Sequence, residues 1–185
     1  MVTHKGTQTI QTERLTLRRF KTEDAQPMFC NWANDERVTR FLTWASHGSP
    51  ELTRELLEAW CADYENSNVY NWAIEFDGEA IGSIGVANFS DRSEWAELGY
   101  CIGYDFWNKG IMTEAVGAVI GYLFREIGVN RISILHAVKN PASGRVAQKC
   151  GLTYEGTKRE YFKAASGELL DIAEYAILKK DWDNI

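Results

Sequence analysis

The sequence predicts one mixed α/β domain that spans residues 1–185, with a sheet covered by helices. A strand-like run at 98–103 leads through a short loop into a helical pattern and then into a second strand-like run at 131–138. This order is typical of a βαβ unit with parallel strands and a right-handed crossover. Asp77-Gly78 lies between two further strand-like runs, a strong hairpin signal. Runs at 152–162 and 169–178 predict a last antiparallel pair.

The first third of the chain is expected to form a short strand and two helices. Residues 13–20 alternate apolar and polar side chains, as a half-exposed strand does. Thr22 precedes a helical pattern that ends near Asn34, and residues 38–49 show no clear period. Ser49 and Pro50 predict a second helix, because serine is a favoured N-cap and proline a favoured first helical residue.

The middle of the chain carries the strongest patterns. Strands are expected at 70–76 and 80–89, and the strand after the turn at 90–93 places Glu97, Gly99 and Cys101 on one face. The following helix should begin near Thr113 and end at Gly128. The strand at 131–138 is apolar on both faces, which is typical of the interior of a sheet. His136 lies in this strand, and we interpret it as a hydrogen-bonded core histidine.

The loop before that helix could hold an anion. The first N–H groups of a helix lack intrahelical partners and carry partial positive charge. Gly110 would let backbone amides approach a ligand closely. An ordinary turn explains one glycine equally well, so both interpretations stay open. The sequence contains neither a P-loop nor a dinucleotide-binding motif.

Composition narrows the class of protein. With 185 residues, 45% of them hydrophobic, the chain can form one domain with a substantial core. Its net charge of −6, with both signs mixed, argues against nucleic acid and anionic membranes as partners. No stretch resembles a signal peptide or a membrane span. Widely spaced cysteines indicate reduced thiols in a cytoplasmic protein and no metal site; they are Cys30, Cys61, Cys101 and Cys150.

Four motifs resemble those of the GNAT superfamily of N-acetyltransferases, and most closely its ribosomal-protein N-terminal (Rim-type) branch. They are ELGYCI at 97–102, WNKGIMTEA at 107–115, NPAS at 140–143 and KCGLTYEG at 149–156. The resemblance extends from about residue 12 to 181. It implies a central mixed, mostly antiparallel sheet of about seven strands with helices on both faces, in which parallel strands four and five splay apart. It also implies acetyl-CoA as the cosubstrate.

The resemblance places the cofactor site residue by residue. The pantetheine arm would lie along the family's fourth strand, and Asn140 would hydrogen-bond that arm, although Asn140 before Pro141 is also a good N-cap. Trp107 and Met112 depart from the family pattern, so a side-chain contact from position 107 stays open. The backbone at 108–113 would wrap the pyrophosphate. The residues so implied are Tyr100, Cys101, Ile102, Asn108, Lys109, Gly110, Ile111, Met112, Thr113, Asn140 and Ser143.

The same resemblance suggests catalytic roles. Ser143 would donate a hydrogen bond to the cofactor sulfur, because Ala147 stands where many relatives have tyrosine; a serine facing solvent is the alternative. A backbone N–H near Ile102 or Gly103 would stabilise the oxyanion. For the general base we rank Glu97 first.

Four further positions have less specific interpretations. Glu160 is a second candidate base and Asp171 could bind a cationic amine, yet such carboxylates are often plain surface charges. Trp44 and Trp60 could contact the substrate or simply pack in the core.

The acceptor is expected to be a primary amine, such as the N-terminus of a ribosomal protein. An α-amine has a pKa near 8 and a lysine near 10.4, so the α-amine loses its proton more easily. Two other functions stay open: acetylation of a small amine such as a polyamine, amino sugar or antibiotic, and acyl-CoA sensing without turnover. A homodimer could form through an exposed last strand.

Overall fold

The computed structural model describes residues 2–184 and is built around an eight-stranded sheet of order β1-β2-β3-β4-β5-β6-β8-β7. Only β5 and β6 are parallel; the other neighbours pair antiparallel. The strands are β1 (Ile10–Gln11), β2 (Thr16–Arg18), β3 (Asn71–Phe76), β4 (Glu79–Ser90), β5 (Trp95–Ile102), β6 (Arg131–Ala137), β7 (Thr153–Lys163) and β8 (Leu169–Leu178). The predicted mixed, mostly antiparallel sheet is confirmed. The two-residue β1 raises the expected seven strands to eight, so the family's fourth and fifth strands are β5 and β6.

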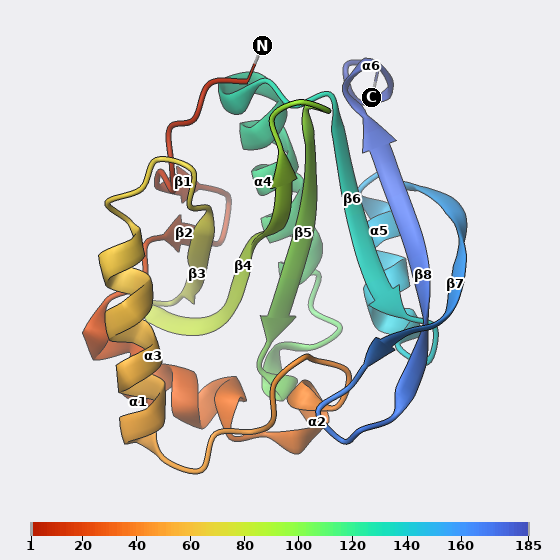
Figure 1. The fold of residues 1–185 in the computed structure, drawn as a ribbon. Coiled ribbons are helices and arrows are strands. Elements are labelled where there is room, and N and C mark those ends of the chain that lie inside the picture. Colours follow the sequence, from red (N-terminus) through yellow and green to blue (C-terminus); the bar gives the residue numbers. More distant parts are fainter. Residues whose placement is uncertain (1, 185) are drawn as a thin grey trace.

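Helices cover both faces of this sheet, with α4 and α5 behind it and α1 and α3 in front in Figure 1. One hydrophobic cluster fills the space between the sheet and α4, and a second packs the sheet against α1 and α3. The helical segments are η1 (Thr22–Asp24), α1 (Ala25–Met28), η2 (Phe29–Ala33), α2 (Glu36–Thr39), α3 (Pro50–Asp63), η3 (Tyr104–Phe106), α4 (Ile111–Tyr122), η4 (Leu123–Ile127), α5 (Pro141–Lys149) and α6 (Lys179–Trp182).

Most predicted elements are confirmed, and their ends follow from local chemistry. Ser49 Oγ accepts a hydrogen bond from Leu52 N–H and caps α3. Asp77 and Gly78 both have positive φ, as a tight hairpin turn requires. The helix expected from Thr113 begins two residues earlier, at Ile111. The strand expected over residues 13–20 is shorter, and α2 forms at the edge of a segment without a clear period.

The parallel strands β5 and β6 separate part-way along their length. They pair only from Trp95 with Arg131 to Leu98 with Ile134. Beyond Leu98, β5 follows β4 and β6 follows β8, so the two strands diverge (Figure 1). The β6-facing backbone groups of β5 are therefore left without a strand partner at this end. The predicted splay is present.

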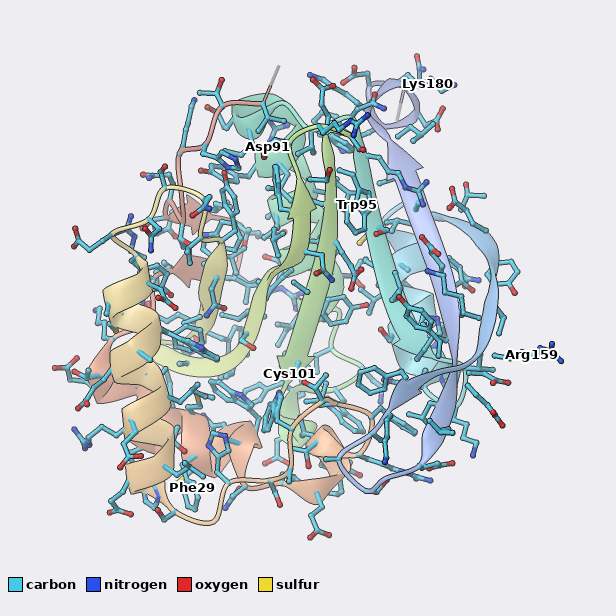
Figure 2. All side chains as sticks on the ribbon, viewed as in Figure 1. Phe29, Asp91, Trp95, Cys101, Arg159 and Lys180 are labelled. Atoms are coloured by element: carbon cyan, nitrogen blue, oxygen red, sulfur yellow. The ribbon has the colours of Figure 1, made fainter. Side chains whose placement is uncertain are left out.

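The prediction of an exposed last strand is wrong. β8 lies between β6 and β7 and pairs with both, so β7 forms this edge of the sheet. β7 bulges opposite Asp171, where Glu160 adopts a positive φ and Arg159 extends away from the body (Figure 2). Bulged edges resist pairing with another strand. A dimer through the edge of β8 therefore cannot form.

The described residues also bear on the expectations for cysteines, membrane-spanning helices and metal sites. The four cysteines are free thiols. Within residues 2–184 no helix has the length and apolarity to cross a bilayer. The same residues contain no group of three or more metal-ligating side chains.

Candidate active site

Two cavities meet at the splayed end of β5. The first, here the loop cavity, has a volume of about 530 Å³ and lies between the end of β5, the start of α4 and the start of α5. The second, here the tryptophan cavity, has a volume of about 880 Å³ and is walled by Trp32, Trp44 and Trp60. Both are lined by Phe41, Leu42, Tyr100 and Cys101. Groups bound in the two cavities could therefore react across Tyr100 and Cys101.

The backbone of the loop cavity is shaped to receive an anion. Asn108 and Gly110 adopt positive φ values of 59° and 76°, and α4 begins at the next residue, Ile111. Arg14 fixes this loop, because its Nη1 donates to Lys109 O at 3.0 Å and its Nε to Glu114 Oε2 at 2.7 Å. The unpaired N–H groups of the first turn of α4 are thus held in place before any ligand arrives.

The side chains of the loop cavity add positive charge. Arg37, Arg145 and Lys149 line it, and the described residues in its lining include no carboxylate. Arg37 lies 3.8 Å above the Tyr104 ring and pairs with Asp35. Such a site favours a phosphate-bearing ligand.

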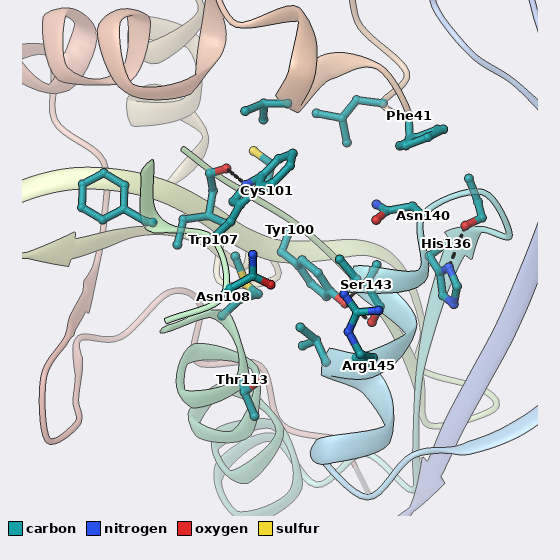
Figure 3. Close-up of a pocket in the computed structure, with 18 of the residues that line it drawn as sticks. Phe41, Tyr100, Cys101, Trp107, Asn108, Thr113, His136, Asn140, Ser143 and Arg145 are labelled. Carbon is teal, nitrogen blue, oxygen red and sulfur yellow. Dashed lines mark hydrogen bonds between the residues drawn. The ribbon is translucent and has the colours of Figure 1, made fainter. Parts of the chain in front are cut away.

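Near residues 102 and 103, the end of β5 turns a backbone donor toward the opening. Gly103 N–H donates to Ile81 O at 2.9 Å, so it is not available to a ligand. Hydrogen bonds alternate along a strand, so Ile102 N–H faces the opening instead. Trp107 Nε1 occupies the neighbouring carbonyl, Ile102 O, at 2.9 Å (Figure 3). Of the two backbone N–H groups expected to stabilise the oxyanion, only that of Ile102 is therefore available. The Trp107 side chain does make a contact, but with the protein backbone at Ile102 O.

Tyr100 and Ser143 connect β5 to α5 across the opening (Figure 3). Their hydroxyl oxygens are 2.8 Å apart, and Tyr100 O–H also lies 3.2 Å from Ser143 O. Burial raises the pKa of Tyr100 above its ordinary value, so the phenol is neutral at pH 7. Ser143 lines the loop cavity instead of facing bulk solvent.

The other residues predicted to bind the cofactor do not all line the loop cavity. Asn140 occupies the N-cap position of α5, but its side chain makes no capping hydrogen bond and lines the cavity. Met112 and Thr113 also line it, whereas Lys109 and Ile111 do not. The Lys109 ammonium lies over the Phe106 ring, and Ile111 is buried in the core. Burial raises the pKa of the Cys101 thiol to about 11.

His136 departs from the expected core histidine. Its Nδ1–H donates to Ala137 O at 2.8 Å, but its buried Nε2 has no hydrogen-bond partner among the described residues. Burial lowers the pKa of His136, which keeps the ring neutral. The ring lines the loop cavity and lies so close to α5 that a Cβ at Gly144 would approach Nε2 to 2.8 Å. Only one of the two ring nitrogens of His136 is therefore hydrogen-bonded within the described residues.

Comparison with known proteins shows which family this chain belongs to. The acetyltransferase (GNAT) domain matches residues 14–153 of the chain. The chain belongs to the GNAT acetyltransferase family. It is an acetyl-CoA-dependent N-acetyltransferase, and the predicted family is confirmed.

Relatives extend over nearly the whole chain. YoaA of Bacillus subtilis (strain 168), an uncharacterized N-acetyltransferase, is 32% identical over 92% of this chain and 96% of its own. The [ribosomal protein uS5]-alanine N-acetyltransferase of Escherichia coli (strain K12) is 34% identical over 94% of this chain and 92% of its own. The solved structure of RimL, a ribosomal L7/L12 alpha-N-protein acetyltransferase in complex with coenzyme A, shares the fold with a TM-score of 0.82 at 21% identity, covering 92% of this chain and 98% of that one.

The loop cavity of this GNAT chain fits acetyl-CoA. Its basic, carboxylate-free lining and the helix start at Ile111 suit the phosphates. The open edge at Tyr100 and Ile102 suits an extended amide-containing arm, which can pair with a strand.

The candidate carboxylates lie outside both cavities. Glu97 precedes Gly99 and Cys101 on the same face of β5, but it lines neither cavity. Burial raises the pKa of Glu97, and a hydrogen bond from Asn88 opposes this shift. Asp171 Oδ1 accepts the Glu160 N–H at 2.8 Å, which stabilises the bulge of β7. Asp171 is thus a structural acceptor, and neither it nor Glu160 lines the loop cavity or the tryptophan cavity.

The tryptophan cavity contains residues that sequence reasoning missed. Asp63 is its one charged lining residue among those described, and His47 lies beside Trp44 with ring centroids 5.3 Å apart. His47 Nδ1 lies 2.7 Å from Thr53 Oγ1, and burial lowers the pKa of His47. No motif marks these positions, since they come from helices and loops without a fixed pattern. Trp44 and Trp60 both pack on the core and line the cavity.

Proposed function

We propose that this enzyme transfers the acetyl group of acetyl-CoA to the N-terminal α-amine of a protein, by direct attack within a ternary complex. One observation carries the proposal. A basic cavity and an aromatic cavity with a single carboxylate meet at Tyr100 and Cys101. An anionic cosubstrate and a cationic amine would each enter the cavity of complementary charge.

The chain's own groups would handle each step of the transfer. As the amine nitrogen bonds to the carbonyl carbon, Ile102 N–H would donate to the developing oxyanion. As the carbon–sulfur bond breaks, Ser143 O–H would donate to the sulfur, with its oxygen held 2.8 Å from the Tyr100 hydroxyl. A thiol has a pKa of about 8.5, so this departure needs only modest assistance.

Glu97 is our candidate for the base that removes the amine proton. It does not line the tryptophan cavity, but it continues the β5 face on which Gly99 and Cys101 line that cavity. A water molecule on this face could carry the proton to Glu97. The raised pKa of its carboxyl favours proton acceptance.

An α-amine suits this modest machinery better than lysine, because its pKa is lower by about two units. The named functions of the ribosomal-protein relatives support a protein N-terminus as the acceptor. A small amine is the second candidate, since a cavity of 880 Å³ is also of the size that takes small molecules. The free thiols support a reducing, cytoplasmic location.

Release of free thiol from acetyl-CoA would test the proposal, with short peptides and small cationic amines as separate panels. We expect release with peptides whose α-amine is free and none with the same peptides after N-terminal blocking. Release with small amines alone would replace the protein acceptor by a metabolite. Silence with both panels, despite acetyl-CoA binding, would point to a sensor.

A further inference from the structure

The tryptophan cavity has an aromatic wall whose rings pack against neighbouring side chains. Trp44 packs against His47, which is itself fixed by Thr53. Trp60 packs against the buried Phe20 ring with centroids 5.1 Å apart. Phe162 of β7 closes another side. Aromatic rings that already pack against neighbours lose little side-chain entropy when they bind a large apolar group.

The floor of the cavity is hollowed by glycine. Gly99 of β5 pairs with Gly85 of β4, and both line the cavity. A Cβ built on Gly99 would meet only Ala87 Cβ, at 3.8 Å, so a larger side chain there would enter open space. The missing side chain of Gly99 creates room directly beside Tyr100 and Cys101, where the proposed mechanism places the amine, whereas a Cβ on Gly85 would lie 2.8 Å from Tyr70 O.

The charge of the lining limits what can enter. Asp63 is its one charged residue among those described, and no lysine or arginine contributes. An acidic side chain would lose hydration there without gaining a partner. A protonated amine attached to an apolar group could form an ion pair with Asp63 and cation–π contacts with the aromatic rings.

Polar lining residues favour a peptide over a compact metabolite. Asn68, Asn71 and Ser83 line the same cavity. Their amide and hydroxyl groups could pair with peptide N–H and C=O groups.

We infer that the acceptor is a peptide N-terminus whose first residue has a large apolar, preferably aromatic, side chain, seated against Trp44 and over Gly99. This inference rests on the proposed N-acetyltransfer to an α-amine and adds the chemical class of the residue that carries it. A first residue as small as alanine would leave the aromatic wall without contacts.

The test uses peptides that differ only in their first residue: alanine, leucine, phenylalanine or tryptophan. We expect kcat/KM to rise from alanine to phenylalanine by at least about 10- to 200-fold, the discrimination that a single methylene brings in an apolar pocket. Trp44→Ala and Gly99→Val should each lower the phenylalanine-to-alanine ratio at least several-fold, the first by removing a wall and the second by filling the floor. Trp182→Ala is the matched control, because Trp182 lies on α6 and lines neither cavity.

Each alternative result would contradict a specific part of this inference. A flat ratio, or a preference for alanine, would overturn the apolar acceptor and leave N-terminal acetylation intact. Turnover of phenylethylamine but of no peptide would overturn the peptide source. If neither panel releases thiol, the proposed function fails and this inference fails with it. A ratio that falls equally in Trp182→Ala would show that stability, not the cavity, sets the preference.

Discussion

At the scale of single residues, the site depends on how Ser143 is oriented. Its hydroxyl lies between the loop cavity and Tyr100, and Tyr100 can also donate to the Ser143 carbonyl at 3.2 Å. Removing the serine hydroxyl therefore leaves Tyr100 with an acceptor. The local structure should survive the change, so a loss of rate can be assigned to chemistry.

We predict that Ser143→Ala lowers kcat by about 10- to 100-fold, at or below the lower limit usual for acid catalysis, because a thiolate leaves easily. The Kd of acetyl-CoA, measured by calorimetry, should stay within about twofold. Ser166→Ala, in the exposed β7–β8 turn, is the control and should change neither quantity. Unchanged kcat in Ser143→Ala would eliminate Ser143 as the donor to sulfur.

A second residue-scale prediction concerns charge at the loop. Gly110 has φ +76°, and a Cβ there would meet only Arg14 Nη2, at 3.6 Å. Asp and Asn tolerate this backbone region better than most residues. Gly110→Asp should weaken acetyl-CoA binding about tenfold more than Gly110→Asn, a difference of about 1.4 kcal/mol, because only Asp brings negative charge beside the phosphates. Equal affinities of the two variants in calorimetry would move the phosphates away from this loop.

The positions of site residues could be predicted only where they follow from a motif. The NPAS motif located Asn140 and Ser143, and the structure places both in the loop cavity. Asp171 carried no such signal, and its carboxylate is occupied by a backbone N–H that a bulge in β7 turns toward it. Bulges and partly exposed loops depend on tertiary packing, which periodicity does not report.

At the scale of elements, the site depends on where β5 ends and α4 begins. Gly103 closes β5, and a Cβ there would lie 2.5 Å from Asn31 O of η2. Ile111 then starts α4 directly after the left-handed Gly110. Hydrophobic spacing predicted the helix itself but placed its start two residues late, because the start is set by these backbone angles.

Two glycine substitutions on these elements should have opposite effects. Gly117 is exposed within α4, and a Cβ there would meet no atom within 4 Å. Gly117→Ala should therefore raise the free energy of unfolding by about 0.5–1 kcal/mol, because alanine favours helix. Gly103→Ala should lower it by about 1–3 kcal/mol, because the added methyl collides with backbone. Urea unfolding of both variants measures this, and a destabilised Gly117→Ala would show that α4 has a tight neighbour at that point.

At the scale of the whole molecule, the sheet consists of two parts joined by few strand-to-strand pairs. Strands β1–β5 and strands β6–β8 meet through the four residue pairs between Trp95–Leu98 and Arg131–Ile134. Past that point, the Tyr100 and Ser143 hydroxyls form a hydrogen bond across the opening. Although the net charge of the chain is −6, the cavity at this junction has a basic lining. Composition alone could not predict where those charges gather.

A ligand that contacts both parts should stiffen them together. Acetyl-CoA in the loop cavity would contact α4 and β5 on one side and α5 on the other. At about 100 times its Kd it should raise the free energy of unfolding by about 2.7 kcal/mol. Hydrogen exchange should then slow at residues 99–102 and 111–114 and also at residues 142–146 of α5. Adenosine 3′,5′-bisphosphate, which lacks the pantetheine arm, is the matched ligand and should protect the start of α4 without protecting 99–102. If acetyl-CoA protected only the start of α4, the cosubstrate would not bridge the splay, and the positions assigned to Tyr100, Asn140 and Ser143 would be wrong.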